Sequence, residues 1–350
     1  MTLLSAHCQE ITVMSFNVAI VGATGAVGEA MLTILEERDF PVGELHLLAS
    51  ERSAGTRLQF RGKSVMVQEL ATFDFNGVHI GRFSAGGSIS AEFAPKAAAA
   101  GCVVIDNTSH FRRDPEIPLV VPEVNASRVA DYKRHNIIAN PNCSTIQMLV
   151  ALKPIYDKVG IRRITVSTYQ AVSGAGRSGV EELASQTARL LNGMSVDQDV
   201  FTRQIGFNAI PHIGGFQDNG YTLEEMKMVW ETRKIFEDED IQVNPTCVRI
   251  PVFYGHSEAI HIETKDRLSA SEASELLAAS PGIELMDTRE DGGYPTAVTE
   301  SAGTDGVFVG RIREDIDLET GLNLWVVSDN VRKGAALNSI QIAEVLIKHL

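Results

Sequence analysis

The first part of the chain alternates short apolar runs with a segment of helical spacing. Residues 16–21 and 44–49 are largely apolar, and each predicts a short buried strand. Between them, a glycine-rich turn at residues 22–28 leads into apolar positions at helical spacing, namely Val27, Met31, Ile34 and Leu35. Strand, glycine turn, helix and strand together predict a βαβ unit with a right-handed crossover.

The same alternation continues to the C-terminus and predicts an α/β fold. Further strands are expected at residues 78–80, 103–105, 137–139, 162–169, 246–252, 259–263 and 324–328. Further helices are expected at residues 91–100, 144–159, 178–191, 222–235 and, from apolar positions after residue 335, at the C-terminus. We expect a dinucleotide-binding domain over residues 14–142 and a second α/β domain over residues 143–330. The last segment, residues 331–350, is expected to return to the first domain.

Composition and charge exclude several classes of protein. Of the 350 residues, 44% are hydrophobic and 22% are charged, which excludes global disorder and suits about two domains. The net charge of −14 argues against a nucleic-acid partner but is compatible with a local basic pocket for a small anion. No apolar run approaches the ~18 residues of a membrane span. The four cysteines include no CxxC pair, so we expect no disulfide scaffold, no metal site and a reducing, cytoplasmic location.

Residues 1–13 form a segment apart. They have neither a basic start nor a long apolar stretch, so they do not resemble a signal peptide. Because Met14 directly precedes the first strand, we expect residues 1–13 to be an unstructured extension.

The glycine turn is the first candidate site. A G-x-x-G-x-x-G between strand and helix lets a pyrophosphate approach the backbone and the helix N-terminus, although a tight turn without ligand has the same pattern. The second strand then ends in the polar segment of residues 50–53. Arg52 with the hydroxyls of Ser50 and Ser53 suits the 2′-phosphate of NADP, whereas Glu51 would suit the free hydroxyl of NAD. We favour NADP, with a solvated charged loop as the alternative.

A cysteine at a helix N-terminus is the second candidate. Cys143 follows Asn142 where a strand gives way to a helix, and the helix dipole is expected to lower the pKa of its thiol. A small capping residue is the alternative interpretation. Cys102 lies in an apolar strand and Cys8 in the N-terminal extension, so Cys247 is the rival nucleophile.

Charged side chains in apolar or polar segments give further candidates. Arg249 lies in an apolar stretch and can be either an exposed residue or a carboxylate-binding fork. His256 follows a glycine at the expected end of a strand, where a base can lie. Arg112 lies in a loop after a buried strand, where open α/β sheets bind ligands. Lys227 lies three residues after Glu224 on a helix, so the two are neighbours.

Together these segments resemble one family over residues 14–350. The resemblance rests on VGATGAVG (21–28), ASERSAG (49–55), FSAGGSIS (83–90), DNTSHFRRDPEIPLVVPEVN (106–125), NPNCSTIQ (140–147), STYQAVSGAGRSGVEEL (167–183), EEMKMVWET (224–232), RIPVFYGHSEAI (249–260) and SDNVRKGAALN (328–338). The chain is similar to the aspartate-β-semialdehyde dehydrogenases of lysine, threonine and methionine biosynthesis. That resemblance implies a Rossmann-like NADP-binding domain plus an α/β catalytic and dimerisation domain.

The resemblance also implies a role for each candidate residue. Cys143 would be the nucleophile that forms an acyl-thioester, His256 the general acid and base, and Gln170 the residue that orients the acyl group. Arg249, Glu224 and Gln170 would bind the substrate, and Arg112, Lys227 and Asn142 would bind phosphate. The residues that would contact NADP are Thr24, Gly25, Ala26, Val27, Arg52, Ser53, Ser173, Gly174 and Asn330.

The implied reaction converts L-aspartyl-4-phosphate reversibly to L-aspartate-4-semialdehyde and phosphate, in a homodimer or a tetramer. Two alternatives stay open at this point. An N-acetyl-γ-glutamyl-phosphate reductase shares the cysteine–histidine arrangement, although Gln170, Glu224 and Lys227 favour aspartate. A non-catalytic NADP-binding homologue would be expected to lack the nucleophile, which this chain keeps.

Overall fold

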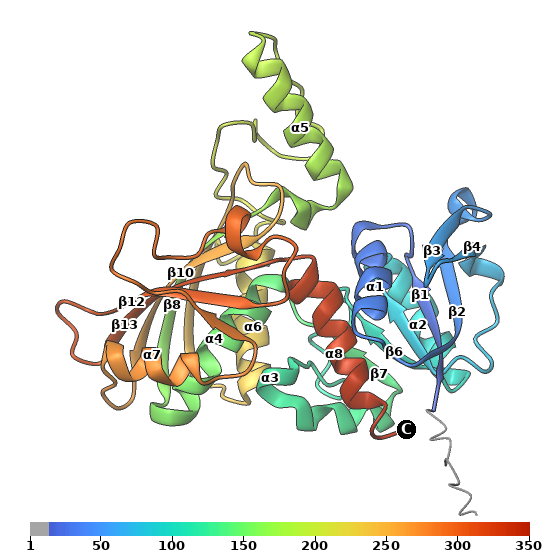
Figure 1. Cartoon of the computed structure of the whole chain (residues 1–350), viewed down its shortest axis with the longest axis horizontal. Helices are drawn as coiled ribbons and strands as arrows, with labels where there is room; N and C mark the ends of the chain where they lie inside the picture. The colour runs from blue at the N-terminus through green and yellow to red at the C-terminus, as the bar shows by residue number, and fades with distance from the viewer. Residues whose placement is uncertain (1–13) are drawn as a thin grey trace, which may run out of the picture.

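The first part of the chain forms a seven-stranded sheet (Figure 1). The computed structural model describes residues 14–350, so the extension predicted at residues 1–13 lies outside it. The strands of this sheet are β1 (Phe16–Val21), β2 (Val42–Ala49), β3 (Arg57–Phe60), β4 (Lys63–Glu69), β5 (Ile80–Phe83), β6 (Val103–Asp106) and β7 (Ile137–Ala139). Their order is β3-β4-β2-β1-β5-β6-β7, and every pair is parallel except β3 with β4. The carboxyl ends of the parallel strands therefore share one edge, where such sheets bind ligands.

A six-stranded sheet carries the second part. Its strands are β8 (Ile161–Gln170), β9 (Gln242–Arg249), β10 (His256–Thr264), β11 (Ile283–Leu285), β12 (Val307–Glu314) and β13 (Gly321–Ser328), in the order β11-β12-β13-β10-β8-β9. Buried residues alternate with half-exposed ones along β8 and β10. One face of this sheet is thus covered and the other is partly open.

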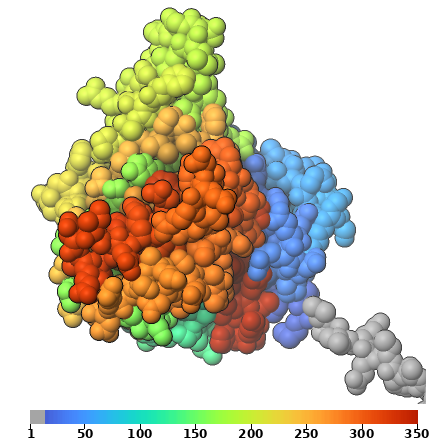
Figure 2. Space-filling model, turned by 60° about the vertical axis from the view of Figure 1, so that its left-hand side comes forward, coloured from blue at the N-terminus to red at the C-terminus, as the bar shows by residue number. Residues whose placement is uncertain are grey.

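Helices connect and cover the sheets. They are α1 (Ala26–Glu37), α2 (Gly87–Ala99), α3 (Pro122–Asn125), α4 (Cys143–Val159), α5 (Arg177–Leu191), α6 (Leu223–Phe236), α7 (Ala270–Ala278) and α8 (Leu337–Leu346). Helix α4 packs against α6, α7 and the second sheet, whereas α8 packs against α1 and β6 of the first. Helix α5 projects away from both sheets (Figures 1 and 2). No helix within residues 14–350 is both long enough and apolar enough to cross a membrane.

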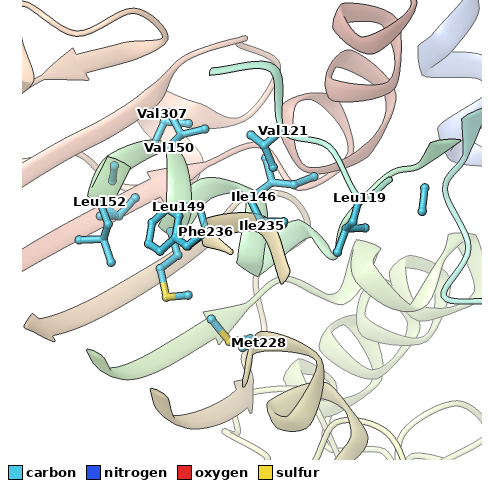
Figure 3. Packing of buried hydrophobic residues seen from close by; sticks show 14 of the residues in the cluster. Leu119, Val121, Ile146, Leu149, Val150, Leu152, Met228, Ile235, Phe236 and Val307 are labelled. Atoms are coloured by element: carbon cyan, nitrogen blue, oxygen red, sulfur yellow. The ribbon is translucent and has the colours of Figure 1, made fainter. Parts of the chain in front are cut away.

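A buried core joins the two sheets around α4. Figure 3 shows Ile146 and Leu149 of α4 beside Phe236 of α6, with Leu119 and Val121 of the segment before α3 nearby. All five side chains are less than a tenth exposed. Helix α4 is therefore held between both parts of the chain, and its N-terminus has a fixed place at their junction.

The structure corrects several sequence-based boundaries. The strand predicted at 78–80 is β5, which runs from Ile80 to Phe83 and includes Gly81 and the buried Arg82. The strand predicted at 246–252 spans Gln242–Arg249, so it begins four residues earlier and ends before Pro251. The pattern did not predict β3, β4, β11 and β12 at all.

Candidate active site

Helix α4 presents Cys143 to a cavity of about 410 Å³ between the two sheets. The Oδ1 atom of Asn142 caps the helix, accepting hydrogen bonds from the backbone N–H groups of Ser144 (3.1 Å) and Thr145 (3.4 Å). Cys143 is the first helical residue and is half-buried. The predicted site residues that line the cavity with it are Val27, Arg112, Asn142, Gln170, Ser173, Gly174, Glu224, Lys227, Arg249 and Asn330.

Two strands end and a third begins at one side of this cavity. Gln170 and Arg249 lie opposite each other at the ends of parallel strands β8 and β9. His256 is the first residue of β10, whose register with β8 places it beside Gln170. A Cβ atom on Gly174 would lie 2.8 Å from Nη1 of Arg249 and 3.5 Å from Nε2 of His256. Both side chains are therefore packed directly against Gly174, which lines the cavity.

The imidazole of His256 has a defined orientation. The backbone N–H of Ala171 donates a hydrogen bond to its Nδ1 atom over 3.1 Å, so the neutral ring carries its hydrogen on Nε2. That Nε2 atom is buried and has no hydrogen-bond partner among the described residues. Burial, reinforced by the positive charge of Arg249, lowers the pKa of His256 to about 3. The ring is neutral near pH 7 and has one hydrogen to donate.

Helix α6 supplies the acidic side of the cavity. Lys227 Nζ donates to Glu224 Oε2 over 2.9 Å, which confirms that these two residues are neighbours. Asn142 Nδ2 donates to Glu224 Oε1 over 2.8 Å. Burial opposes ionisation of Glu224, but the charge and hydrogen bond of Lys227 and the hydrogen bond from Asn142 lower its pKa to about 2. Glu224 is therefore a carboxylate that can receive a cation.

Arg112, in the loop after β6, lies against the same helix. Its Nη1 atom donates to Glu231 Oε1 over 3.0 Å, and its Nη2 atom donates to the carbonyl of Asn107 over 2.8 Å. The neighbouring Arg113 instead lies over the ring of Trp230, 4.0 Å from its centroid. Of the two adjacent arginines, only Arg112 lines the cavity.

A second cavity of about 490 Å³ lies at the ends of β1 and β2. The predicted cofactor residues that line it are Thr24, Gly25, Arg52 and Ser53, together with Ser50 and Glu51. Ala26 lines neither cavity. Sequence reasoning missed Glu69, Leu70, Ala71, Ser84, Ala85, Ile89 and Phe93, which also line the second cavity. Most of them follow β4 and β5, the strands that the apolar pattern did not reveal or misplaced.

The glycine turn fits a dinucleotide. Helix α1 begins after Gly25, which provides no side-chain cap, so the first N–H groups of the helix are available to an anion. A Cβ atom on Gly28 would lie 2.3 Å from the carbonyl oxygen of Gly22, so only glycine permits this close packing of turn and helix.

Comparison with known proteins decides the family. The profile of the semialdehyde dehydrogenase NAD binding domain matches residues 17–132, and that of the semialdehyde dehydrogenase dimerisation domain matches residues 152–333. Aspartate-semialdehyde dehydrogenase 2 of Vibrio cholerae is 62% identical over 333 residues, which cover 95% of this chain and 98% of that protein. The chain belongs to the aspartate-semialdehyde dehydrogenase family. The N-acetyl-γ-glutamyl-phosphate reductase alternative is not favoured.

Solved structures of aspartate-semialdehyde dehydrogenases agree with this assignment. The crystal structure of the Vibrio cholerae enzyme II complexed with ASA has a TM-score of 0.94 and 61% identity, covering 96% of this chain and 99% of that one. The enzyme from Candida albicans, solved with NADP, has a TM-score of 0.75 and 27% identity, covering 95% and 99%. The predicted α/β fold, the oxidoreductase activity in amino-acid biosynthesis and a nicotinamide dinucleotide cofactor are confirmed.

The thiol of the aspartate-semialdehyde dehydrogenase site differs from the sequence-based expectation. Burial raises the pKa of Cys143 to about 12; the charge of Glu224 adds to this effect, while Lys227, Arg249 and Arg112 oppose it. This direction is the opposite of the predicted one, because burial disfavours the charged thiolate. Cys247 is fully buried, faces Met228 and does not line the cavity, so it is a poor rival nucleophile.

Proposed function

We propose that this aspartate-semialdehyde dehydrogenase acts through Cys143, converting L-aspartate-4-semialdehyde, phosphate and NADP⁺ reversibly to L-aspartyl-4-phosphate and NADPH. One observation carries the proposal: a thiol at a helix N-terminus lines the same cavity as Arg112 and Arg249. The imidazole of His256 packs against Gly174, which also lines this cavity. The two guanidinium groups suit a substrate with a carboxylate at one end and an incoming phosphate at the other.

The chain's own residues divide the work of the oxidative direction. The Sγ atom of Cys143 attacks the aldehyde carbon, and the carbonyl π electrons move to oxygen. His256 acts as the general acid and base: the proton lost by the Cys143 thiol ends on that oxygen, which gives a thiohemiacetal, and it leaves again through His256 when the oxygen becomes a carbonyl. Arg249 binds the α-carboxylate and Glu224 binds the ammonium group. Gln170, at the end of β8, orients the carbonyl group.

The second half of the reaction in this direction forms the acyl phosphate. NADP, held by the residues named below, would supply the hydride acceptor with which the carbon attached to Cys143 is oxidised to a thioester. Arg112, Lys227 and Asn142 hold the phosphate whose oxygen attacks that thioester, and the thiolate leaves. The biosynthetic direction is the reverse.

The cofactor is NADP in this proposal because of the polar end of β2. Arg52 and the hydroxyls of Ser50 and Ser53 line the second cavity and suit a 2′-phosphate, while Glu51 lies among them. The remaining contacts are those of the glycine turn at residues 24–27 and of Ser173, Gly174 and Asn330. Arg52→Ala should raise KM for NADP about tenfold and leave KM for NAD nearly unchanged, since one charge-assisted contact is lost. Equal changes for both cofactors would contradict this choice.

We also propose that the chain divides into a cofactor domain, residues 14–142 with 331–350, and a catalytic and dimerisation domain, residues 143–330. A homodimer, or a tetramer of two dimers, is supported by the partly open face of the second sheet and by exposed apolar side chains on the arm that begins with α5. Leu191, the last residue of α5, and Phe207, in the segment after it, are 74% and 64% exposed. Sedimentation of Leu191→Asp beside the wild type tests this. A reducing cytoplasm suits the unpaired Cys102 and Cys247.

The deciding experiment measures NADPH formation from L-aspartate-4-semialdehyde with and without phosphate. Wild-type activity should require phosphate and disappear in Cys143→Ala. The matched control is Cys247→Ala, which removes a buried thiol that does not line the cavity and should keep the activity. Activity that survives Cys143→Ala, or that ignores phosphate, would reject the acyl-thioester route.

A further inference from the structure

A buried carboxylate lies behind the cavity and takes no part in the proposed chemistry. Glu231, in the second half of α6, is 2% exposed and does not line the cavity. It accepts hydrogen bonds through both oxygens: Oε1 from Nη1 of Arg112 over 3.0 Å, and Oε2 from the backbone N–H of Asn142 over 2.6 Å. One carboxylate therefore connects the anion-binding arginine with the residue directly before the nucleophile.

Helix α6 holds Asn142 at two points. Glu224 and Glu231 are seven residues apart, which places them on one face two turns apart. Glu224 accepts from the side-chain amide of Asn142 and Glu231 from its backbone N–H. Because Asn142 also caps α4, these two contacts fix the backbone from which the side chain of Cys143 extends.

We propose that Glu231 is a positioning residue that holds Arg112 and the backbone of Asn142 and Cys143 in register, so that the bound anion faces the thioester. This role rests on the proposed function, in which Arg112 binds phosphate. Glu231 acts only through these two partners and touches neither substrate nor cofactor.

The chemistry of the side chain explains why a carboxylate is needed. Arg112 and the N–H of Asn142 are both donors, so the residue between them must accept twice. Glutamine keeps the size of glutamate but has one acceptor oxygen, and its NH₂ group would face one of the two donors. Glu231→Gln must therefore release either Arg112 or the backbone before Cys143, while removing a single charge.

The test compares Glu231→Gln with a matched control. Glu344 of α8 accepts from Arg38 through both oxygens, over 2.6 and 2.8 Å, at a half-buried position away from both cavities. Glu344→Gln should leave the kinetics unchanged. In Glu231→Gln, we expect KM for phosphate to rise about tenfold, because a charge-assisted contact that orients Arg112 is lost. We expect kcat to fall about 100-fold, because the nucleophile is misplaced, while KM for NADP stays the same.

Three outcomes would overturn the proposal. A lower stability with unchanged KM for phosphate would show a purely structural role. A lower KM for phosphate would show that Glu231 acts only by weakening the positive charge of Arg112. Glu231→Asp serves if the glutamine variant does not fold. Its carboxylate is one carbon shorter and cannot reach both donors, so KM for phosphate should rise there too, and an unchanged value would also contradict the proposal.

Calorimetric titration of inorganic phosphate separates this inference from the proposed function. If wild-type turnover ignores phosphate, the proposed function fails. In that case the calorimetric affinity for inorganic phosphate still tests the inference, because Glu231→Gln should bind phosphate more weakly than the wild type if Glu231 positions Arg112.

Discussion

Replacing Gly334 by alanine should lower activity, because the nucleophile packs directly against this glycine. It lies in the π-helical turn Arg332–Ala336 before α8 and is buried. A Cβ atom there would lie 2.7 Å from Cβ of Cys143 and 3.2 Å from its Cα. The first distance is about 0.7 Å shorter than the ~3.4 Å at which ordinary contact begins, so either the turn or the nucleophile must move.

The size of the effect of Gly334→Ala follows from that overlap. Overpacking lowers the free energy of unfolding by about 1–3 kcal/mol, and the higher helix propensity of alanine relative to glycine raises it by up to ~1 kcal/mol. We therefore expect a modest loss of about 1–2 kcal/mol in the free energy of unfolding. Activity should suffer more, because misplacing a reacting group by about 1 Å costs up to ~100-fold, so kcat/KM should fall roughly 10- to 100-fold.

Two measurements check this prediction. Urea unfolding gives the stability, and steady-state NADPH formation gives kcat/KM. Gly215→Ala is the control, since its Cβ would meet nothing within 4 Å and its surroundings are exposed. A Gly334→Ala variant with kcat/KM within about twofold of the wild type would refute the reasoning, because the nucleophile would then tolerate a displacement of this size.

Two further predictions concern buried titratable groups. His256 is neutral in the fold while the unfolded chain binds a proton below about pH 6.5, so falling pH favours unfolding. The control is His256→Asn, whose amide oxygen can still accept a hydrogen bond from Ala171. Between pH 6.5 and 5.5 the free energy of unfolding of the wild type should fall by about 1 kcal/mol more than that of this variant. Equal losses of free energy in urea unfolding would disprove this. Lys333, 1% exposed, donates to both oxygens of Glu123 over 2.7 Å. Lys333→Met leaves that carboxylate without its charged partner and should lower the free energy of unfolding by about 3–5 kcal/mol. A loss under ~1 kcal/mol would contradict this prediction.

The parts of the fold that could be predicted are those in which burial and hydrophobicity coincide. β1 is apolar and buried along almost its whole length, so its pattern indicated the correct element. β5 could not be placed correctly because it contains Gly81 and Arg82. Arg82 is fully buried, donates to Ser339 and lies over the ring of Phe40, which no local pattern reveals. Such positions depend on partners from distant parts of the chain.

The site divides in the same way. Cys143 could be found because a strand, an asparagine cap and a helix are adjacent in sequence. The adjacency of Gln170, Arg249 and His256 depends on the register of three strands, which the sequence does not contain locally. No local sequence feature marks Glu231, and only its two distant donors distinguish it.

The charges around Cys143 explain how a thiol of raised pKa can serve as a nucleophile. Burial raises the pKa of Cys143 most and the negative charge of Glu224 raises it further, whereas Lys227 lowers it. In the proposed mechanism the substrate ammonium group binds Glu224, so substrate itself would offset the unfavourable charge and favour the thiolate when it is needed.

This balance can be tested without turnover, through the rate of alkylation of Cys143 by iodoacetamide at pH 8. Glu224→Gln should accelerate alkylation, about tenfold for each pKa unit lost, because only the thiolate reacts. Lys227→Met should slow it. Cys143→Ala corrects for the other cysteines. If both variants were alkylated at the wild-type rate, burial alone would set the pKa of Cys143. If both variants were alkylated faster, or both more slowly, packing and not charge would set the reactivity of the thiol.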